Sequence, residues 1–569
     1  MSSDAETLQA MKNSCEAPLW MNLESYLTLK EGYLLPDETP RGMYKRVAKA
    51  AASYYPNESE YWQNRFFEAM WMNWLCPATP VLSNMGTTRG LPISCNSIHV
   101  GDSIDSIYMK AHELAMLSKN GAGVGIYMGG VRGRNAVITG NGTSEGIIPW
   151  CRTYDTTTVS VNQGSTRRGA SAIYLPIEHS DAEEFVDLRR PTGDVNRRCL
   201  NTNHGFTITN EWMQSMLAGD EEKRRLWERI LKARVETGQP YLFFTDNVND
   251  RSPACYKERG FKVVTSNICT EIVLYTDVDH SFVCCLSSLN AARFHEWPKD
   301  LGAVATRFLD AVLSEYIEKS KNIPGLEASR RSAIKGRAIG IGILGWHTLL
   351  QLEGLPFDSF GSMQLNAKVF SVIRRSAENE STRLAIEFGE PEWCAGSGRR
   401  NTHLLAIAPT VSNSTISGGY SAGIEPIVAN IYSVKGAKGT FIRKNPVLKQ
   451  LLESLGKDTD ETWKSINANS GSVQHLSFLT EEQKQVFLTA REINQHAIVK
   501  QAVQRQAWVD QAQSVNLFFA SNSDPKYIHE VHVAAWEQGL KTLYYLRAEG
   551  VLKGDLASRS KDECAACEG

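Results

Sequence analysis

The sequence lacks any run of about 18 uninterrupted apolar residues, so it predicts no membrane-spanning helix. Its first segment, MSSDAETLQAMKNSCE, has neither the basic flank nor the apolar core of a secretory signal. It also lacks an excess of basic residues: Lys and Arg total 61, Asp and Glu total 63, and the net charge is -2. Because proteins that neutralise nucleic-acid phosphates show a basic excess or stripe, we do not expect a nucleic-acid polymer as a partner.

Cysteine is also sparse, with 12 residues in a chain of 569, which is too few for a disulfide scaffold. Without an export signal, these thiols are expected in a reducing cytoplasm, where functional cysteines are catalytic, redox-active or metal-bound. The sequence shows no dense cluster of histidine and carboxylate residues, so we expect no metal site in this chain. What remains is an ordinary globular composition, 42% hydrophobic and 22% charged, over a length greater than one ordinary domain.

Three regions follow from the patterning along the chain. Residues 1–75 predict a small helical region, because apolar residues recur at helical spacing. Residues 76–548 alternate short β-branched or aromatic runs with amphipathic stretches, which favours an α/β architecture. Residues 549–569 lose periodicity and predict a flexible tail. The expected helices include Met43–Ala52, Glu60–Leu75, Asp105–Leu117, Glu222–Glu236, Leu301–Ser320, Val369–Phe388 and Asp524–Gln538. The expected strands include Val124–Met128, Ser171–Leu175, Tyr241–Phe244, Lys262–Val264, Ile272–Tyr275 and Thr542–Leu546.

The segment TSNICTE, residues 265–271, carries three chemically different side chains at alternate positions. If it is extended, Asn267, Cys269 and Glu271 share one face, because side chains alternate along a strand. A thiol, a carboxylate and an amide would then converge on one bound molecule, as reactive sulfur, base and orienting group. The alternative is a half-buried strand with a polar face.

Other cysteines are less distinctive. Cys95 and the adjacent pair Cys284 and Cys285 are each consistent with a buried thiol that acts as a small hydrophobe. The terminal pair Cys564 and Cys567 lies in the predicted tail without a neighbouring histidine. A dithiol on a tether suits thiol–disulfide exchange, which requires thiolate access, and the alternative is an inert tail.

Two loop-like segments concern phosphate binding. Residues 409–415, PTVSNST, are small hydroxyl and amide residues that suit a phosphate cradle at a helix start, or an ordinary Ser/Thr turn. Thr79 and Ser94 supply further hydroxyls. The glycine motif at residues 340–345 matches G-x-G-x-x-G, but it follows a charged, helix-like run rather than a clear strand. We therefore do not predict a nicotinamide site there.

Taken in order, these segments resemble the large catalytic subunit of class I ribonucleotide reductase. The resemblance covers roughly residues 70–569. It rests on ATPVLSN with PISCNSIHVGDSIDS, NQGSTRRGAS, SNICTEI, CCLSSLN, PTVSNST with AGIEP, GLKTLYYLR and the terminal CAAC. It implies a ten-stranded α/β barrel with Cys269 on a central finger loop, preceded by the small helical region.

The resemblance also implies the chemistry. Cys269 becomes a transient thiyl radical that takes the 3′-hydrogen of a ribonucleoside diphosphate. Glu271 acts as base on the 3′-hydroxyl, and Asn267 orients it. Water leaves from C2′, and two electrons come from Cys95 with Cys284. The pattern C-x-L-S-x-x-N selects Cys284, although a swap with Cys285 stays open.

Partners follow from the same resemblance. Tyr544 and Tyr545 match the family's radical-transfer pair, which receives the radical from a separate metal-bearing small subunit. The alternative for two adjacent tyrosines is a strand that packs aromatic rings. Cys564 and Cys567 would reduce the active-site disulfide and be reduced in turn by thioredoxin or glutaredoxin. The resemblance also implies a homodimer, in which effectors bind at the interface between two copies of the chain.

Substrate and effector residues are carried over one by one. Thr79, Ser94, Thr410, Val411, Ser412 and Asn413 align with the diphosphate contacts. Val411 stands where a Glu occurs in relatives, a change that a backbone N–H contact would survive. Asp102 and Arg132 match positions that bind an ATP or dNTP effector with Mg²⁺, and Gln163 and Arg167 match the loop that relays effector identity. Only 94 residues precede Cys95, so we expect no N-terminal ATP-cone and no on–off control by ATP and dATP there.

Two other functions compete with this interpretation. One is an adenosylcobalamin-dependent relative that works alone, which the tyrosine pair argues against. The other is a nucleotide-binding regulatory protein that keeps the barrel without catalysis. The intact Cys269, Glu271 and dithiols argue against such decay.

Overall fold

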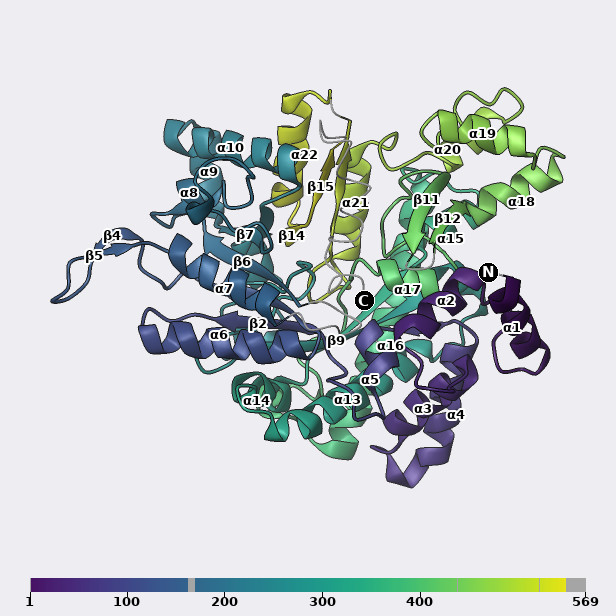
Figure 1. Cartoon of the computed structure of the whole chain (residues 1–569), viewed down its shortest axis with the longest axis horizontal. Helices are drawn as coiled ribbons and strands as arrows, with labels where there is room; N and C mark the ends of the chain where they lie inside the picture. Colours follow the sequence, from purple (N-terminus) through teal and green to yellow (C-terminus); the bar gives the residue numbers. More distant parts are fainter. Residues whose placement is uncertain (1, 162–168, 437–438, 521, 549–569) are drawn as a thin grey trace.

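The N-terminal part of the chain is helical, as expected. The computed structural model describes residues 2–161, 169–436, 439–520 and 522–548. Purple helices at the lower right of Figure 1 pack on α13 (Leu301–Lys319). In α3 (Pro40–Ala52), the Thr39 side chain accepts the Gly42 N–H and caps the first turn, and Met43, Val47 and Ala51 share the buried face. The helices of this N-terminal part are α1 (Ser2–Asn13), α2 (Leu23–Gly32), α3 (Pro40–Ala52) and α4 (Ser59–Trp71).

Half of the central sheet is parallel. Its strands are almost fully buried, as their continuous apolar runs require when helices cover the outside. The strands lie in the order β2 (Cys95–His99), β3 (Gly123–Tyr127), β6 (Ala170–Pro176), β7 (Asn203–Ile208) and β8 (Tyr241–Phe244). The connecting helices α6 (Ile104–Lys119), α7 (Ile148–Ser160), α9 (Asn210–Ala218) and α10 (Glu221–Thr237) lie on the left of Figure 1.

The other half of the central sheet begins where β9 (Phe282–Asn290) runs antiparallel to β2. On its other side, β9 pairs in parallel with β10 (Ile339–Leu344), and the N-terminal strand β1 (Leu75–Pro77) pairs with its end. Bridges continue the ring from β10 to residues 404–407 and then to residues 512–515. Residue 544 bonds to residue 515, and β14 (Thr542–Leu543) pairs with β8, so the ring closes. The predicted ten-stranded α/β barrel is thereby confirmed, with short bridges in place of full strands along part of the ring.

The remaining elements surround the barrel or extend from it. Within the described residues, two hairpins lie outside the barrel, one at the far left of Figure 1 and one near the light-green helices at the upper right. The hairpins are β4 (Arg134–Val137) with β5 (Thr143–Glu145), and β11 (Ile431–Gly436) with β12 (Gly439–Lys444); a parallel pair joins β13 (Leu517–Phe519) to β15 (Leu546–Ala548). The other helices are α5 (Thr79–Asn84), α8 (Ala182–Phe185), α11 (Thr245–Asp250), α12 (Ala254–Lys257), α14 (Glu327–Gly336), α15 (Trp346–Leu352), α16 (Phe360–Phe388), α17 (Val411–Ile416), α18 (Pro446–Ser454), α19 (Asp460–Ala468), α20 (Glu481–Val486), α21 (Gln495–Arg505) and α22 (Pro525–Glu537).

The glycine motif at residues 340–345 lies within β10 and just after it, not in a turn that follows a strand. A Cβ on Gly340 would come within 2.4 Å of Leu286, and one on Gly342 within 2.7 Å of the Ala406 carbonyl oxygen. These glycines therefore permit close packing of neighbouring strands. Their position gives no support to a dinucleotide site.

Two expected strands are wrong. Residues 262–264 and 272–275 form no strand, although they flank the finger loop. Their backbone bonds to side chains instead of to a neighbouring strand: Val263 N–H donates to Asn249 Oδ1, and Val273 N–H donates to Gln511 Oε1. The strand expected at Thr542–Leu546 is also interrupted at its two tyrosines. Across the described ranges, no helix has the length and apolar character that a transmembrane span requires.

Candidate active site

Cys269 lies at the tip of a tight loop inside the barrel. The loop is not the extended segment considered from the sequence: Asn267 N–H donates to the Ile272 carbonyl, and Thr270 adopts a φ of 69°. Its base runs so close to β3 that a Cβ on Gly125 would lie 1.9 Å from the Ser266 carbonyl oxygen. Glycine at position 125 thus makes room for the loop.

The loop is held from several sides of the barrel. Tyr174 on β6 donates its hydroxyl to the Asn267 carbonyl at 2.6 Å. Ser514 Oγ donates to the Cys269 carbonyl at 2.5 Å, and Thr542 Oγ1 donates to the Thr270 carbonyl at 3.0 Å. Because these donors come from separate elements, the position of the Cys269 backbone depends on the closed ring.

Asn267 and Glu271 converge even though the segment turns. Asn267 Nδ2 donates to Glu271 Oε1 at 2.9 Å, and the Ser514 hydroxyl shares its one hydrogen between the Cys269 carbonyl and Glu271 Oε2, which lies 3.2 Å away. Burial raises the pKa of Glu271 to about 7, although both hydrogen bonds oppose the rise. A carboxyl group with a pKa near neutrality suits proton transfer at physiological pH.

Cys95 and Cys284 lie opposite each other on neighbouring strands. They are paired residues in the antiparallel register of β2 and β9. Cys95 Sγ is also 4.0 Å from Glu271 Oε1, so this sulfur faces the finger loop. Cys285 points the other way, because side chains alternate along a strand, and its thiol contacts the Leu309 carbonyl at 3.2 Å. The geometry therefore favours Cys284 over Cys285 as the partner of Cys95.

The tyrosines form an aromatic cluster against Cys269. The rings of Tyr544 and Tyr545 are 4.3 Å apart between centroids. Tyr241, which the sequence analysis did not single out, lies 4.8 Å from Tyr544 and 5.1 Å from Tyr545. Cys269 and Tyr174 belong to the same buried cluster. Burial raises the pKa of Tyr544 well above its ordinary value, so the phenol stays protonated.

The phosphate-binding candidates come from two helix starts and one strand start. Thr79 begins α5, and Val411, Ser412 and Asn413 form the first turn of α17, where a helix presents backbone N–H groups. The first turn of α17 lies beside the strand that leads into α5, since Asn413 Nδ2 contacts the carbonyl of Cys76 in β1 at 3.4 Å. Ser94 directly precedes β2 and Cys95. Thr410 has a φ of 54°, and its hydroxyl accepts the Gly423 N–H at 2.7 Å, which turns the chain into α17.

The effector candidates are only partly visible. Asp102 and Arg132 form an ion pair at 2.8 Å, each about one-third exposed. Gln163 and Arg167 lie outside the described residues, as do the tail cysteines Cys564 and Cys567.

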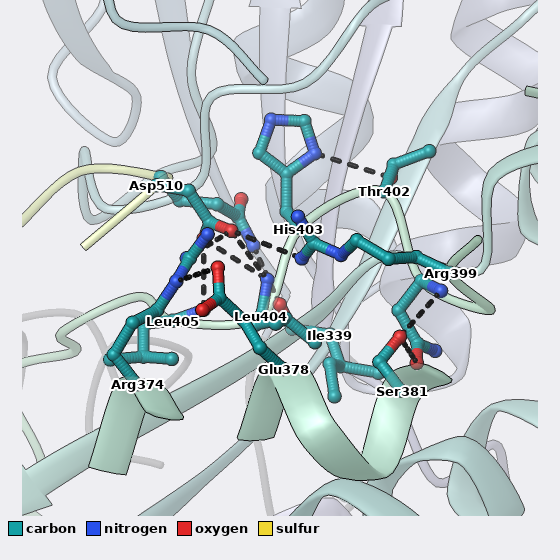
Figure 2. Close-up of polar contacts among 12 residues, drawn as sticks. Ile339, Arg374, Glu378, Ser381, Arg399, Thr402, His403, Leu404, Leu405 and Asp510 are labelled. Carbon is teal, nitrogen blue, oxygen red and sulfur yellow. Dashed lines mark hydrogen bonds and ion pairs between the residues drawn. The ribbon is translucent and has the colours of Figure 1, made fainter. Parts of the chain in front are cut away.

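Several supporting residues were not predicted from the sequence: Tyr174, Tyr241, Gln511 and Ser514. No local sequence pattern marks these residues, because each contacts a site residue that is distant in the sequence. Gln511 directly follows Asp510, whose carboxylate accepts the Leu404 and Leu405 N–H groups and pairs with Arg374 at 2.6 Å (Figure 2). Although burial alone would raise the pKa of Asp510, Arg374, His403 and Arg399 hold it well below its usual range.

Comparison with known proteins agrees with this barrel and its central loop. The sequence matches the ribonucleotide reductase all-alpha domain over residues 20–90 and the ribonucleotide reductase barrel domain over residues 93–223, 219–397 and 392–546. The chain belongs to the ribonucleotide reductase large-subunit family. It is the catalytic subunit of a ribonucleoside-diphosphate reductase, an oxidoreductase of deoxyribonucleotide synthesis.

Individual relatives span nearly the whole chain. The class Id ribonucleotide reductase alpha subunit of Actinobacillus ureae has a similar structure, with a TM-score of 0.87 and 40% identity, covering 95% of this chain and 99% of that one. The ribonucleoside-diphosphate reductase large subunit of Invertebrate iridescent virus 3 is 33% identical over 95% of this chain and 97% of its own length. The corresponding large subunit of Monkeypox virus is 30% identical over 93% of this chain and 77% of its own length.

Proposed function

We propose that this chain reduces ribonucleoside diphosphates by thiyl-radical chemistry at Cys269. The observation that carries the proposal is the position of this cysteine. Cys269 packs on the buried tyrosines. Asn267 and Glu271 of the same finger loop contact each other, and Glu271 faces Cys95 of the proposed dithiol. An oxidising equivalent can therefore arrive on one side while substrate chemistry occurs on the other.

In the proposed reaction, the Cys269 thiyl radical takes the hydrogen atom from C3′. Glu271 accepts the proton of the 3′-hydroxyl, and Asn267 holds that hydroxyl and the carboxylate in place. Water leaves from C2′. Cys95 and Cys284 supply two electrons and two protons and become a disulfide, and Cys269 then returns a hydrogen atom to C3′. Overall, a ribonucleotide and a dithiol become a deoxyribonucleotide, water and a disulfide.

The Glu271 environment supports its role as base. Its pKa of about 7 lets the carboxylate exist in the buried site at neutral pH and still bind a proton during the reaction. Asn267 and Ser514 each occupy one carboxylate oxygen. The carboxylate is thus oriented before substrate binds, which reduces the reorganisation needed in the transition state.

We further propose that the radical comes from a separate metal-containing small subunit through Tyr545 and then Tyr544. Tyr545 is the more exposed of the two rings, at 8% against 2% for Tyr544, and Arg547 on β15 lies over it with its guanidinium carbon 4.4 Å from the ring centroid. An apolar groove of about 820 Å³ adjoins this end of the relay, lined by α10, α22 and Ala548. Its walls include Trp227, Leu231, Val235, Phe519 and Ile528.

This groove is the proposed docking site of the small subunit. Gly238, which ends α10, packs so closely on Tyr545 that a Cβ there would lie 3.1 Å from the ring. A partner seated between α10 and α22 therefore lies next to the outer tyrosine, as radical transfer requires. Figure 1 shows α10, α22 and β15 together at one edge of the barrel.

The remaining assignments concern phosphates, effectors and reductant. We propose that Thr79, Ser94 and the first turn of α17 bind the substrate diphosphate, since Ser94 adjoins Cys95 and a helix start favours anions. Asp102 and Arg132, with Gln163 and Arg167, would bind an ATP or dNTP effector with Mg²⁺ at a homodimer interface and relay its identity. Cys564 and Cys567 would carry electrons from thioredoxin or glutaredoxin. We propose region boundaries at about residues 75 and 548.

The test is an assay of the full chain with its cognate small subunit, thioredoxin and a series of effectors. Formation of dCDP and dADP that depends on the small subunit supports the proposal, and effector-dependent choice between them supports specificity control. Product formed by the chain with adenosylcobalamin alone would contradict the need for a partner. Nucleotide binding without any product would favour a regulatory protein.

A further inference from the structure

One buried side-chain amide connects three parts of the barrel at the proposed dithiol. Gln511 is fully buried, and its Nε2 donates to Cys284 Sγ at 3.2 Å and to the Ile339 carbonyl at 3.0 Å. Its Oε1 accepts the Val273 N–H at 3.3 Å. The amide thus joins β9, β10 and the chain that leaves the finger loop.

These contacts determine which end of the amide faces the sulfur. The Val273 N–H is a donor and requires the Gln511 oxygen, and the Ile339 carbonyl is an acceptor and requires the nitrogen. The two Nε2 hydrogens therefore face the Ile339 carbonyl and Cys284 Sγ. The sulfur is the acceptor in this contact, and a thiolate accepts a hydrogen bond more strongly than a thiol does.

The backbone of Gln511 is held as firmly as its side chain. Its N–H donates to the Leu405 carbonyl at 3.1 Å, and its carbonyl accepts from Gln506 Nε2 at 2.9 Å. The preceding residue is Asp510, which accepts the Leu404 and Leu405 N–H groups. The network in Figure 2 therefore fixes the point from which the amide reaches Cys284.

The two sulfurs of the proposed disulfide consequently differ. Cys284 is 0% exposed and faces the Gln511 donor, whereas Cys95 is 7% exposed and lies 4.0 Å from Glu271 Oε1. An ionised Glu271 disfavours negative charge on both sulfurs and lies 4.0 Å from Cys95, whereas the Gln511 amide favours negative charge on Cys284. Burial raises the pKa of Cys284 well above its ordinary value, and the hydrogen bond from Gln511 opposes that rise.

We propose that Gln511 is a positioning residue that makes Cys284 the leaving sulfur when the Cys95–Cys284 disulfide is reduced. This inference rests on the proposed function, which supplies that disulfide. A thiolate of the reducing dithiol attacks Cys95 Sγ and forms a mixed disulfide with it. The electron pair of the broken S–S bond goes to Cys284, whose thiolate accepts the Gln511 N–H and then takes up a proton inside the closed site, which balances the proton that the attacking thiol lost on ionisation. The second thiol of the reductant, as its thiolate, then attacks the reductant sulfur that is bonded to Cys95. Cys95 leaves as a thiolate and takes a proton, and the reductant ends as a disulfide.

The first experiment maps the attacked sulfur. Full-length enzyme with both tail cysteines changed to serine is oxidised by one turnover, treated briefly with glutathione, quenched with acid and analysed by peptide mass spectrometry. We expect the glutathione adduct on Cys95. An adduct confined to Cys284 would overturn the inference. If turnover leaves no Cys95–Cys284 disulfide at all, the proposed function itself fails.

The second experiment measures how fast dithiothreitol reduces the same disulfide. Gln511→Met keeps the side-chain length but removes the donor, and we expect reduction to slow by about tenfold or more, because a hydrogen bond to a charged acceptor is lost. The matched control is Gln513→Met, since Gln513 Nε2 donates to the Ala502 carbonyl and Gln506 Oε1. Equal slowing in both variants, or no slowing in Gln511→Met, would overturn the inference.

A third variant separates positioning from general loss of packing. Gln511→Glu nearly preserves size and places a titratable group beside Cys284. We expect its reduction rate, relative to that of the unsubstituted enzyme, to fall as pH rises, because an ionised carboxylate repels the leaving thiolate. A constant ratio across the pH range would contradict the proposed role.

Discussion

The side-chain amide of Asn267 donates a 2.9 Å hydrogen bond to Glu271 Oε1 across the base of the finger loop. Two residues that are four positions apart thus meet because the intervening chain turns back at Thr270. This contact orients the buried carboxylate toward Cys95. The first two predictions concern that carboxylate.

Glu271→Gln should lower kcat by about a hundredfold or more, because general base catalysis contributes on the order of 10²–10⁴ in rate. In the unsubstituted enzyme, kcat should fall as pH decreases through about 7, since only the ionised carboxylate accepts the proton. The measurement is deoxynucleotide formation between pH 6 and 8.5 with the small subunit in excess. A flat profile would argue against Glu271 as the base.

The same substitution should change how stability depends on pH. The pKa of Glu271 is about 7 in the folded chain and near 4.5 when unfolded, so the folded state binds the proton more tightly. This stabilisation is complete below about pH 4.5 and is lost as pH rises through 7. The Tm of Glu271→Gln minus the Tm of the unsubstituted chain should therefore be higher at pH 8 than at pH 5. In free energy of unfolding, the change between the two pH values is about 3 kcal/mol. Calorimetry at both pH values measures it, and an unchanged Tm difference would contradict the pKa.

Cys269→Ser should abolish turnover and leave substrate binding intact, because only the radical step requires sulfur. Nucleotide binding is measured by calorimetry and product by chromatography. Cys199→Ser is the matched control, since Cys199 is also buried but belongs to a different cluster from Cys269. Substantial deoxynucleotide formation by Cys269→Ser would refute the assigned role.

Tyr544→Phe and Tyr545→Phe should each block turnover while the small-subunit radical stays intact. Phenylalanine preserves the ring packing, with 4.3 Å between centroids, but loses the oxidisable hydroxyl. Tyr54→Phe serves as a control, because that hydroxyl bonds to Glu318 far from the finger loop in sequence and outside the tyrosine cluster. Product assays are combined with electron paramagnetic resonance of the partner radical. A normal rate of product formation by Tyr544→Phe or Tyr545→Phe would contradict the assignment of that tyrosine to radical transfer.

Leu231→Glu should weaken small-subunit binding by at least tenfold, since it places a charge in the apolar groove between α10 and α22. Ile386→Glu is the control, because Ile386 is an exposed apolar residue on α16. Affinity is measured by surface plasmon resonance, and substrate binding confirms that the variant is folded. Equal affinity in both variants would exclude the groove as the docking site.

Local patterns in the amino-acid sequence were enough to predict the class of the fold, most long helices and the residues with reactive groups. Local apolar spacing is sufficient for α10 and α13, and the strand β8 matches its expected bounds, because each pattern reflects burial of one element. The order of motifs was sufficient to single out Asn267, Cys269 and Glu271.

How those groups meet depends on long-range contacts in the folded barrel. The segment around Cys269 is a turn and not a strand, because side chains from β6, from residue 514 and from residue 542 bond its carbonyl groups. Cys284 and not Cys285 lies opposite Cys95 because β2 and β9 pair in one register. Gln511 reaches Cys284 across 227 positions of sequence. Such contacts are set by closure of the barrel, and no local pattern of residues contains that information.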